Sequence, residues 1–394
     1  MHFNYFSSPG RVYKGNHHTH SDKSDGILSP EEVCRRYAEH GYDFISLTDH
    51  FVGLFDYPIV STESFRTEFF STILGAEVHS GSMENGEIWH ILAVGLPKNF
   101  NPPNAPHFLP IEDQESAKEL AIRCKEAGAF VSIAHPQWSG MSFNDAKTLA
   151  PHSHSVEIYN HGCAVDCDRP DGTHMLDLLL SDGLKLNAIA TDDAHFKTKD
   201  YFGGWVNVKA ENNEPESLLT ALKKGYYYSS CGPEIENIEV NKNQIILTKS
   251  IKHGYFQPFP EDKITGDGVY SKMPREQRTL SEPQVLNYKI TITLLDKKTE
   301  VAVEVIGTNN VLVSLEMNFR KGGKLSGVIS DQNRPDSYFL EDGWGSYSKD
   351  GSVITFGPGK IEHKWGTMRG MEEKPNGNTV YVNGHTPFNH VLEI

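Results

Sequence analysis

The chain has 394 residues and a formal net charge of −15, and 38% of its residues are hydrophobic. This length is typical of two domains, and the apolar content is sufficient for buried cores. The negative charge argues against nucleic acid or an anionic membrane surface as the main partner.

Three features of the sequence predict where in the cell the protein is located. No apolar run is long enough to span a bilayer, and residues 1–6 lack the basic and apolar regions of a signal peptide. The five cysteines show no disulfide framework, so we expect free thiols and a cytoplasmic protein. A structural zinc site at Cys163 and Cys167, near His161 and His174, is an alternative, but it lacks a second cysteine pair.

The first predicted strand, residues 11–14, leads into a histidine-rich segment. His18 and His20 are two positions apart, so on a strand their side chains point to the same side. Two imidazoles placed in this way can bind one transition-metal ion. Asp25 follows in a Ser-Asp-Gly turn, which could return its carboxylate toward the same point.

The next 180 residues alternate helical and apolar strand patterns. Ser29 as N-cap, Pro30 in the first turn and Glu32 in a capping box predict a helix that ends at Gly41. Further helices are predicted at residues 116–127, 173–181 and 216–225. Further strands are predicted at residues 43–50, 71–79, 88–95, 129–136, 155–160 and 186–195. This order suggests parallel strands joined by crossover helices, which is an α/β fold.

Ligand-type side chains follow these strands. Six of the seven predicted strands carry His, Asp or Glu at or just beyond the carboxyl end. In a barrel of parallel strands, this end is where catalytic groups collect. The pattern therefore favours a metal site at the mouth of a barrel over histidines scattered by chance.

The pattern changes after about residue 234. Short alternating runs, separated by Gly, Asn and Asp, predict an all-β domain that resembles a sandwich. The charged, proline-containing stretch at residues 258–282 is predicted to be a long loop. The predicted domains are therefore residues 1–235, an α/β barrel that carries the candidate metal site, and residues 236–394, a β-sandwich-like domain.

The ligand motifs resemble those of the polymerase and histidinol phosphatase (PHP) superfamily of metal-dependent phosphoesterases. The similar motifs are His-Thr-His-Ser with Ser-Asp-Gly, Leu-Thr-Asp-His, Gly-Ala-Glu-Val, Ile-Ala-His-Pro and Asp-Ala-His, in family order. The resemblance spans roughly residues 10–235 and implies a distorted seven-stranded (β/α) barrel of the TIM-like kind. Residues 317–323 faintly resemble sandwich domains appended to polysaccharide lyases, which implies carbohydrate-linked substrates or a structural cap.

The PHP resemblance also implies a trinuclear metal site. Its implied ligands are His18, His20 and Asp193 for one metal, Glu77, His90 and His135 for a second, and Asp25, His50 and His195 for a third, with Glu77 also bridging to the first. Zinc, manganese and iron all suit such ligands. Asp192 competes with Asp193, but the family's D-x-H spacing favours Asp193. Weaker claims belong to His79, His17, Glu157 and Asn160.

The implied reaction is the release of phosphate from a small-molecule phosphate ester, with a metal-bridged hydroxide as the nucleophile. Glu77 would serve catalysis as the bridge, and Arg169 and His161 as phosphate clamp or proton donor. A solvated surface role for Arg169 is equally compatible with the sequence. The alternatives are a metal-dependent ester or carbamate hydrolase and a non-catalytic, metal-stabilised binding module. The oligomeric state is not defined by the sequence.

Overall fold

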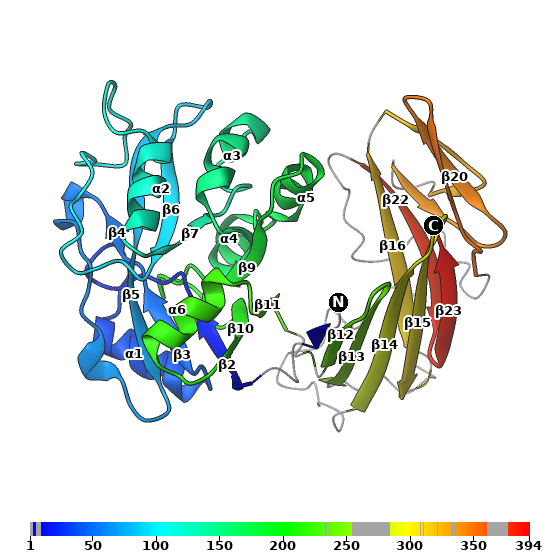
Figure 1. Ribbon diagram of the computed structural model, residues 1–394, viewed down its shortest axis with the longest axis horizontal. Coiled ribbons are helices and arrows are strands. Elements are labelled where there is room, and N and C mark those ends of the chain that lie inside the picture. The colour runs from blue at the N-terminus through cyan, green and yellow to red at the C-terminus, as the bar shows by residue number, and fades with distance from the viewer. Residues whose placement is uncertain are drawn as a thin grey trace, which may run out of the picture. The chain divides into compact units, whose positions relative to one another are not determined.

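The computed structural model of the protein is shown in Figure 1. It describes residues 3–4, 9–232, 235, 237–253, 284–307, 309, 311–320, 322–331, 336–360 and 377–394, so the loop predicted at residues 258–282 lies outside the described residues. The chain forms two compact units, Ser8–Gly232 and Met1–Ser7 with Pro233–Ile394, which we call the barrel unit and the β unit. The sequence assigns residues 1–7 to the first domain, but β1 (Phe3–Asn4) pairs with β12 of the β unit.

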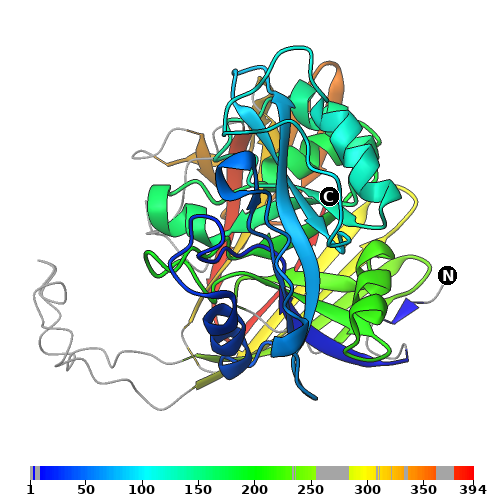
Figure 2. The same cartoon turned by 90° about the vertical axis from the view of Figure 1, so that its left-hand side faces the viewer.

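The described strands of the barrel unit form a sheet with the order β11-β10-β2-β3-β5-β6-β7-β8-β9, and β4 pairs with β5. Their bounds are β2 Arg11–Asn16, β3 Phe44–Leu47, β4 His50–Phe51, β5 Ser71–Ser82, β6 Ile88–Val94, β7 Phe130–Ile133, β8 Ser155–Asn160, β9 Asn187–Thr191, β10 Trp205–Ala210 and β11 Tyr227–Ser230. The long β5 is prominent in Figure 2. Beyond the ends of β2 and β9, Thr19 bridges Ala194, and the Asp193 amide donates to the His18 carbonyl at 2.8 Å. These contacts join the first and last strands of the predicted seven, so the α/β barrel predicted from the sequence is confirmed.

The strand directions correct one expectation. The neighbouring pairs β2–β3, β3–β5, β7–β8 and β8–β9 are parallel, as predicted. However, β6 runs antiparallel to both β5 and β7, because residues 83–87 connect β5 to β6 as a hairpin and not through a crossover helix. The start of β6 therefore lies at the end of the barrel where its neighbours finish. This explains how His90, near the start of its strand, can join ligands that follow the ends of other strands.

The helices of the barrel unit accompany the strands. Their bounds are α1 Pro30–Glu39, α2 Ala117–Glu126, α3 Phe143–Leu149, α4 His161–Cys167, α5 Thr173–Ser181 and α6 Pro215–Lys223. Ser29 caps α1 as predicted, by accepting from the Glu32 amide, but the Glu32 carboxylate binds Arg35 and Arg36 instead of closing a capping box. Full capping boxes do begin α2 and α3. The sequence did not predict α3, α4, β10 or β11.

Apolar side chains fix the barrel on several sides. One buried cluster packs β5, β6 and β7 against α2, α3 and α5, and includes Val78, Ile91, Val131, Leu120 and Leu179. A second cluster joins Phe44, Leu92, Phe130 and Ile189 to α6. At ~25 cal/mol per Å² of buried apolar surface, such clusters provide the main stabilisation of the scaffold. The strand ends that carry polar side chains are therefore held on a rigid frame.

The β unit contains three described sheets, with the orders β1-β12-β13-β14-β15-β23, β16-β22-β19-β18 and β17-β20-β21. The bounds of its strands after β1 are β12 Asn237–Val240, β13 Gln244–His253, β14 Gln284–Leu294, β15 Thr299–Gly307, β16 Leu312–Arg320, β17 Lys324–Ser326, β18 Ile329–Ser330, β19 Ser337–Phe339, β20 Gly345–Lys349, β21 Ser352–Phe356, β22 Gly377–His385 and β23 Phe388–Glu393. Met317, Phe356, Val380 and Leu392 share a core that connects the sheets. The predicted sandwich-like β domain is thus confirmed. Among the described residues, no helix is both long and apolar enough to cross a membrane.

Candidate metal centre

Polar side chains converge at one end of the barrel. Among the described residues, four overlapping groups place ligand atoms within 4.8 Å of one another. They are His18, His20 and Asp193; His18, Glu77 and His135; His50, Glu77, His79 and His90; and His20, Asp25, His50 and His195. The nine side chains that the sequence assigns to metals are all in these groups. His79 also belongs to one of the groups, and His18, His20 and His50 each belong to two of them.

Glu77 lies at the centre of these groups. Its side chain is completely buried, in the middle of β5. Glu77 Oε1 is 2.8 Å from His90 Nδ1 and 3.1 Å from His135 Nε2. Glu77 Oε2 is 2.7 Å from His50 Nδ1 and 3.5 Å from His18 Nε2. The two carboxylate oxygens therefore face different sets of imidazoles, as the predicted bridge requires.

The first predicted ligand set is gathered around Asp193. Its Oδ1 lies 3.2 Å from His18 Nε2 and 3.0 Å from His20 Nε2. The amide of Asn160 donates to the other oxygen, Oδ2, at 3.0 Å. Asp193 has a φ of +55°, in the left-handed region that Asp tolerates better than most residues. The structure thus brings this set together through the junction of β2 and β9.

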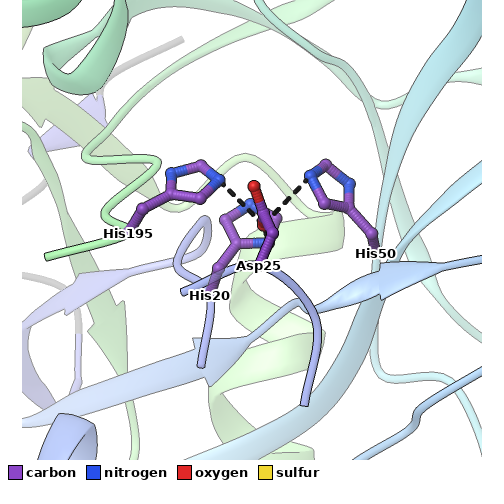
Figure 3. A group of neighbouring side chains, drawn as sticks. All are labelled: His20, Asp25, His50 and His195. Carbon is purple, nitrogen blue, oxygen red and sulfur yellow. Dashed lines mark ion pairs between the residues drawn. The ribbon is translucent and has the colours of Figure 1, made fainter. Parts of the chain in front are cut away.

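The third predicted set surrounds Asp25. Figure 3 shows the rings of His195 and His50 approaching the Asp25 carboxylate from opposite sides, with His20 beside it. Asp25 Oδ1 is 3.1 Å from His195 Nε2, 3.5 Å from His50 Nε2 and 4.0 Å from His20 Nδ1. His20 and His195 stack, with their ring centroids 4.3 Å apart. The turn after the first strand therefore does return Asp25 to the barrel mouth.

His79 has a more definite place than its sequence position suggests. Its Nδ1 faces the Trp89 carbonyl at 3.2 Å, and its Nε2 lies 3.1 Å from His50 Nδ1. An N–H donated to Trp89 leaves Nε2 as a lone pair toward the cluster. The available signal was its position two residues after Glu77, which on a strand places both side chains on one face. His17, by contrast, is buried between the rings of Phe44 and Phe130.

Hydrogen bonds from outside the groups orient several rings. Glu157 Oε1 lies 2.9 Å from His18 Nδ1, and Glu157 Oε2 accepts from the His135 amide at 2.6 Å. Ser139 Oγ is 3.0 Å from His135 Nδ1. In metal sites, such contacts to the outer ring nitrogen fix the tautomer that leaves the inner nitrogen free to bind. Glu157 is therefore positioned to orient ligands, and it lies outside the four groups.

Two adjacent aspartates have different surroundings. Asp192 Oδ1 accepts from the amides of Gly203 and Gly204 at 2.8 Å, and Asp192 Oδ2 accepts from the Tyr37 hydroxyl at 2.7 Å. Burial raises the pKa of Asp192 to about 6, against the lowering effect of these hydrogen bonds. Asp192 thus holds the chain after β9 in place, while Asp193 faces the imidazoles.

Burial and the charges of neighbouring side chains act in opposite directions on several groups of the site. Burial alone would raise the pKa of Glu77, but the imidazoles of His50, His90 and His18 hold it well below its usual range. Burial lowers the pKa of His20 to about 3, helped by His195 and His50, and also lowers the pKa of His90. Against the lowering effect of burial, neighbouring carboxylates raise the pKa of His18, His135 and His195, that of His195 to about 9. Ligand imidazoles must be neutral and ligand carboxylates ionised, so metal binding would release protons from these three histidines.

Several inward-facing atoms have a close neighbour but no hydrogen bond. Among the described residues, His18 Nε2, Glu77 Oε2 and Asp25 Oδ1 are buried without a hydrogen-bond partner, although each lies within 3.5 Å of an imidazole or carboxylate atom of another group member. Burying such groups unpaired is costly. Divalent cations among these atoms would satisfy them, and the His/carboxylate donor set suits transition metals. The residues present therefore fit the metals that the sequence implies.

A cavity of about 820 Å³ opens over the centre and is lined by Glu77, His50, His90, His135 and Asp193. Arg169 also lines it, as does Lys197, whose Nζ lies 3.0 Å from Asp25 Oδ2. His161 is not among the lining residues; its Nδ1 lies 3.1 Å from the Tyr159 hydroxyl. Lys197 is a cation that the sequence reasoning missed, because it lies past the last ligand in a loop without a recognisable motif.

No protein-family model and no curated protein matches the chain. Its structure is similar to that of a two-domain protein from Bacteroides vulgatus that contains a predicted PHP-like metal-dependent phosphoesterase, at a TM-score of 0.42 and 18% identity, over 75% of this chain and 90% of that one. Another similar structure is a candidate metal-dependent phosphoesterase from Bifidobacterium adolescentis, at a TM-score of 0.37 and 15% identity, over 54% and 96% of the two chains. A third is an amidohydrolase from Chromobacterium violaceum with bound sulfate and no metal, at a TM-score of 0.33 and 16% identity, over 46% of this chain and 87% of that one.

Proposed function

We propose that this protein is a metal-dependent hydrolase of the PHP type that releases phosphate from a small-molecule phosphate ester. The observation that carries the proposal is the completely buried Glu77 carboxylate, whose two oxygens face different imidazoles. An ionised carboxylate is expensive to bury without a compensating charge. Bound cations provide that charge, so the cluster is best explained as a metal centre.

The proposed metal positions are the three implied by the sequence. His18, His20 and Asp193 would hold one ion, Glu77, His90 and His135 a second, and Asp25, His50 and His195 a third. The first and third lie within groups of the structure, whereas the second joins His90 and His135, which belong to separate groups that share Glu77. His79 and the sharing of His18, His20 and His50 between groups extend this set beyond the ligands implied by the sequence. Zinc, manganese and iron remain the proposed metals.

When bound, divalent cations would lower the pKa of water toward ~7 and would neutralise phosphate oxygens. The residues of this chain supply the rest. Glu157 and Ser139 hold the rings of His18 and His135 in one orientation. Arg169 and Lys197 line the cavity as cations, so we assign them to binding the phosphate group, where Arg can donate two parallel hydrogen bonds. His161 stays a prediction as proton donor.

The deciding experiment is an assay of purified, metal-loaded protein on matched aryl phosphates and aryl esters. We expect turnover of the phosphates and a preference of at least ~100-fold over the esters, since the cationic side chains favour an anionic substrate. The Arg169→Ala variant should raise KM for the phosphate. Selective turnover of esters or carbamates would replace the proposal by the alternative hydrolase, and a metal-loaded protein inactive on every ester class would support the binding module.

A further inference from the structure

We propose, on the basis of the phosphoesterase function above, that the substrate is a phosphate ester of an alcohol with a flat aromatic ring. The ring would be held by Trp138 and Phe108, next to the metal centre. Neither residue belongs to the ligand motifs, and both line the cavity.

The apolar residues of the cavity are Met83, Ile88, Phe108 and Trp138. Trp138 is 44% exposed, so much of its indole remains accessible at the cavity wall. It meets the rings of His135 and His90 edge to face, at centroid distances of 4.8 and 5.4 Å. A ring stacked on the open side of this indole would bury apolar surface that the chain itself leaves exposed.

Phe108 lies on the same group of imidazoles. Its ring centroid is 4.9 Å from that of His50 and 5.2 Å from that of His79, both edge to face, and it is nearly parallel to His90 at 6.1 Å. Phe108 and Trp138 therefore both contact His90. A planar group against either ring would therefore lie beside His90, a proposed metal ligand, where an alcohol joined to the reacting phosphate would be placed.

The turn that carries Trp138 is held in place before any ligand binds. The Ser139 amide donates to the His135 carbonyl at 3.1 Å, and the Met141 amide donates to the Pro136 carbonyl at 3.0 Å. The Asn85 side chain donates to the Ser139 carbonyl at 2.8 Å, which ties the turn to the β5–β6 hairpin. A fixed aromatic surface loses little conformational entropy on binding, so the contact contributes to affinity.

The distribution of polar groups favours an aromatic ring over a sugar. A sugar needs hydrogen-bond partners for several hydroxyl groups, and a site built for them provides such partners. Beside the apolar residues, the lining offers the polar side chains of Asn85, Glu87, Ser139 and Asp166. Three of them are already engaged within the protein: the Asn85 amide binds the Ser139 carbonyl, Ser139 Oγ lies 3.0 Å from His135 Nδ1, and Asp166 accepts from the Thr198 hydroxyl. The cations of the lining, Arg169 and Lys197, come instead from segments that follow β8 and β9.

The test compares phosphate esters whose leaving groups are all primary alcohols, so that intrinsic reactivity differs little. We expect kcat/KM for benzyl phosphate to exceed that for cyclohexylmethyl phosphate, ethyl phosphate and glucose 6-phosphate by roughly 3- to 10-fold. Trp138→Ala should remove this preference, and Trp138→Phe should retain part of it. Phe69→Ala is the matched control, because Phe69 is 76% exposed and does not line the cavity. Metal content is measured for every variant, to show that the ligands of the centre are undisturbed.

A second readout does not depend on turnover. Calorimetry should show that benzylphosphonate binds more tightly than methylphosphonate in the wild type and that Trp138→Ala equalises the two. A benzyl preference absent from the wild type, or unchanged in Trp138→Ala, overturns the aromatic-ring proposal. If no phosphate ester is hydrolysed but the Trp138-dependent preference for benzylphosphonate is present, the ring site is upheld and the phosphoesterase function is overturned. If neither phosphonate binds and no ester is hydrolysed, both are overturned.

Discussion

At the scale of single residues, the centre contains carboxylates whose burial costs free energy unless a positive charge lies beside them. Glu77 is completely buried, and the carboxylate of Glu157, also buried, lies 2.9 Å from His18 Nδ1. Their hydrogen bonds and imidazole neighbours determine which atoms face inward. Residues whose atoms face inward are proposed metal ligands, whereas residues that bind backbone amides position the chain. Substitutions can test this distinction.

Asp192 and Asp193 are adjacent and chemically identical, but we expect their substitutions to fail in different ways. Asp192→Ala removes the acceptor of buried amides and of the Tyr37 hydroxyl, so it should lower the free energy of unfolding by roughly 3 kcal/mol. Asp193→Asn should leave stability of the metal-free protein nearly unchanged but reduce bound metal. Urea unfolding and metal analysis of the two variants provide the comparison; the reverse pattern would mean that the two roles have been exchanged.

Glu157→Gln tests orientation without removing a proposed ligand. Glutamine retains the size of the side chain but loses the charge that faces His18 and part of the acceptor capacity used by the His135 amide. Changes of this kind in metal sites cost ~10–100-fold in affinity or activity. We therefore expect weaker metal binding in a competition titration with a chelator. An affinity equal to that of the wild type would show that Glu157 does not orient the ring of His18.

At the scale of elements, the β5–β6 hairpin and the loop after β2 do most to complete the centre. The antiparallel β6 brings His90 to the barrel mouth, and the loop brings Asp25. Asp49 secures this loop: its Oδ1 accepts from the Ser21 amide at 2.7 Å and from the Ser24 hydroxyl at 2.6 Å. Asp25 therefore depends on a neighbouring carboxylate that is not a member of any of the four groups.

Asp49→Ala should release the loop and weaken the metal position formed by Asp25, His50 and His195, although all three side chains remain. The expected result is a selective loss of one ion in metal analysis, with the barrel still folded by circular dichroism. Asp43→Ala is the matched control, because Asp43 also accepts a backbone hydrogen bond, from the Lys14 amide at 2.7 Å, but lies before β3 and not after it. Equal metal loss in both variants would indicate a general destabilisation instead.

The extent to which the sequence predicts this architecture differs between elements. The seven strands and four main helices are marked by apolar runs, caps and terminal glycines, and they occur where predicted. The direction of β6 could not be read, because a buried strand has the same apolar pattern in either orientation. The short α3 and α4 were missed because a helix of two turns shows little periodicity, although Ser142 and Asp145 do form a capping box before α3.

For the candidate site, the motifs identify side chains, but the geometry between them comes only from the closed barrel. The sharing of His18, His20 and His50 between groups cannot be inferred from spacing, since their neighbours come from distant strands. Lys197, Phe108 and Trp138 lie in loops that carry no motif. Their relevance depends on the cavity, which forms only when these loops are packed together.

At the scale of the whole molecule, all of the proposed ligands lie in one unit. Residues 8–232 contain the four groups and the cavity, while β1, from the N-terminus, pairs with β12 of the β unit. The barrel unit thus has the groups needed for metal binding and its own buried cores. Among the described residues, the β unit provides none of the ligand groups.

A fragment of residues 8–232 should therefore fold and bind the same number of metal ions as the full chain. The comparison uses metal analysis and circular dichroism of the fragment and the complete protein, prepared in the same way. A folded fragment that binds fewer ions than the full chain would show that the remaining residues contribute ligands.

The most direct test of the metal centre is the metal content per folded chain in the wild type and in Glu77→Gln, measured by mass spectrometry after loading with zinc or manganese. Glutamine retains the shape of Glu77 but cannot bridge two cations as an anion. We predict three ions in the wild type and the loss of more than one in Glu77→Gln, against the loss of one in His135→Ala. A folded wild-type protein without stoichiometric metal, or a Glu77→Gln variant with unchanged metal content, would contradict the bridging metal centre.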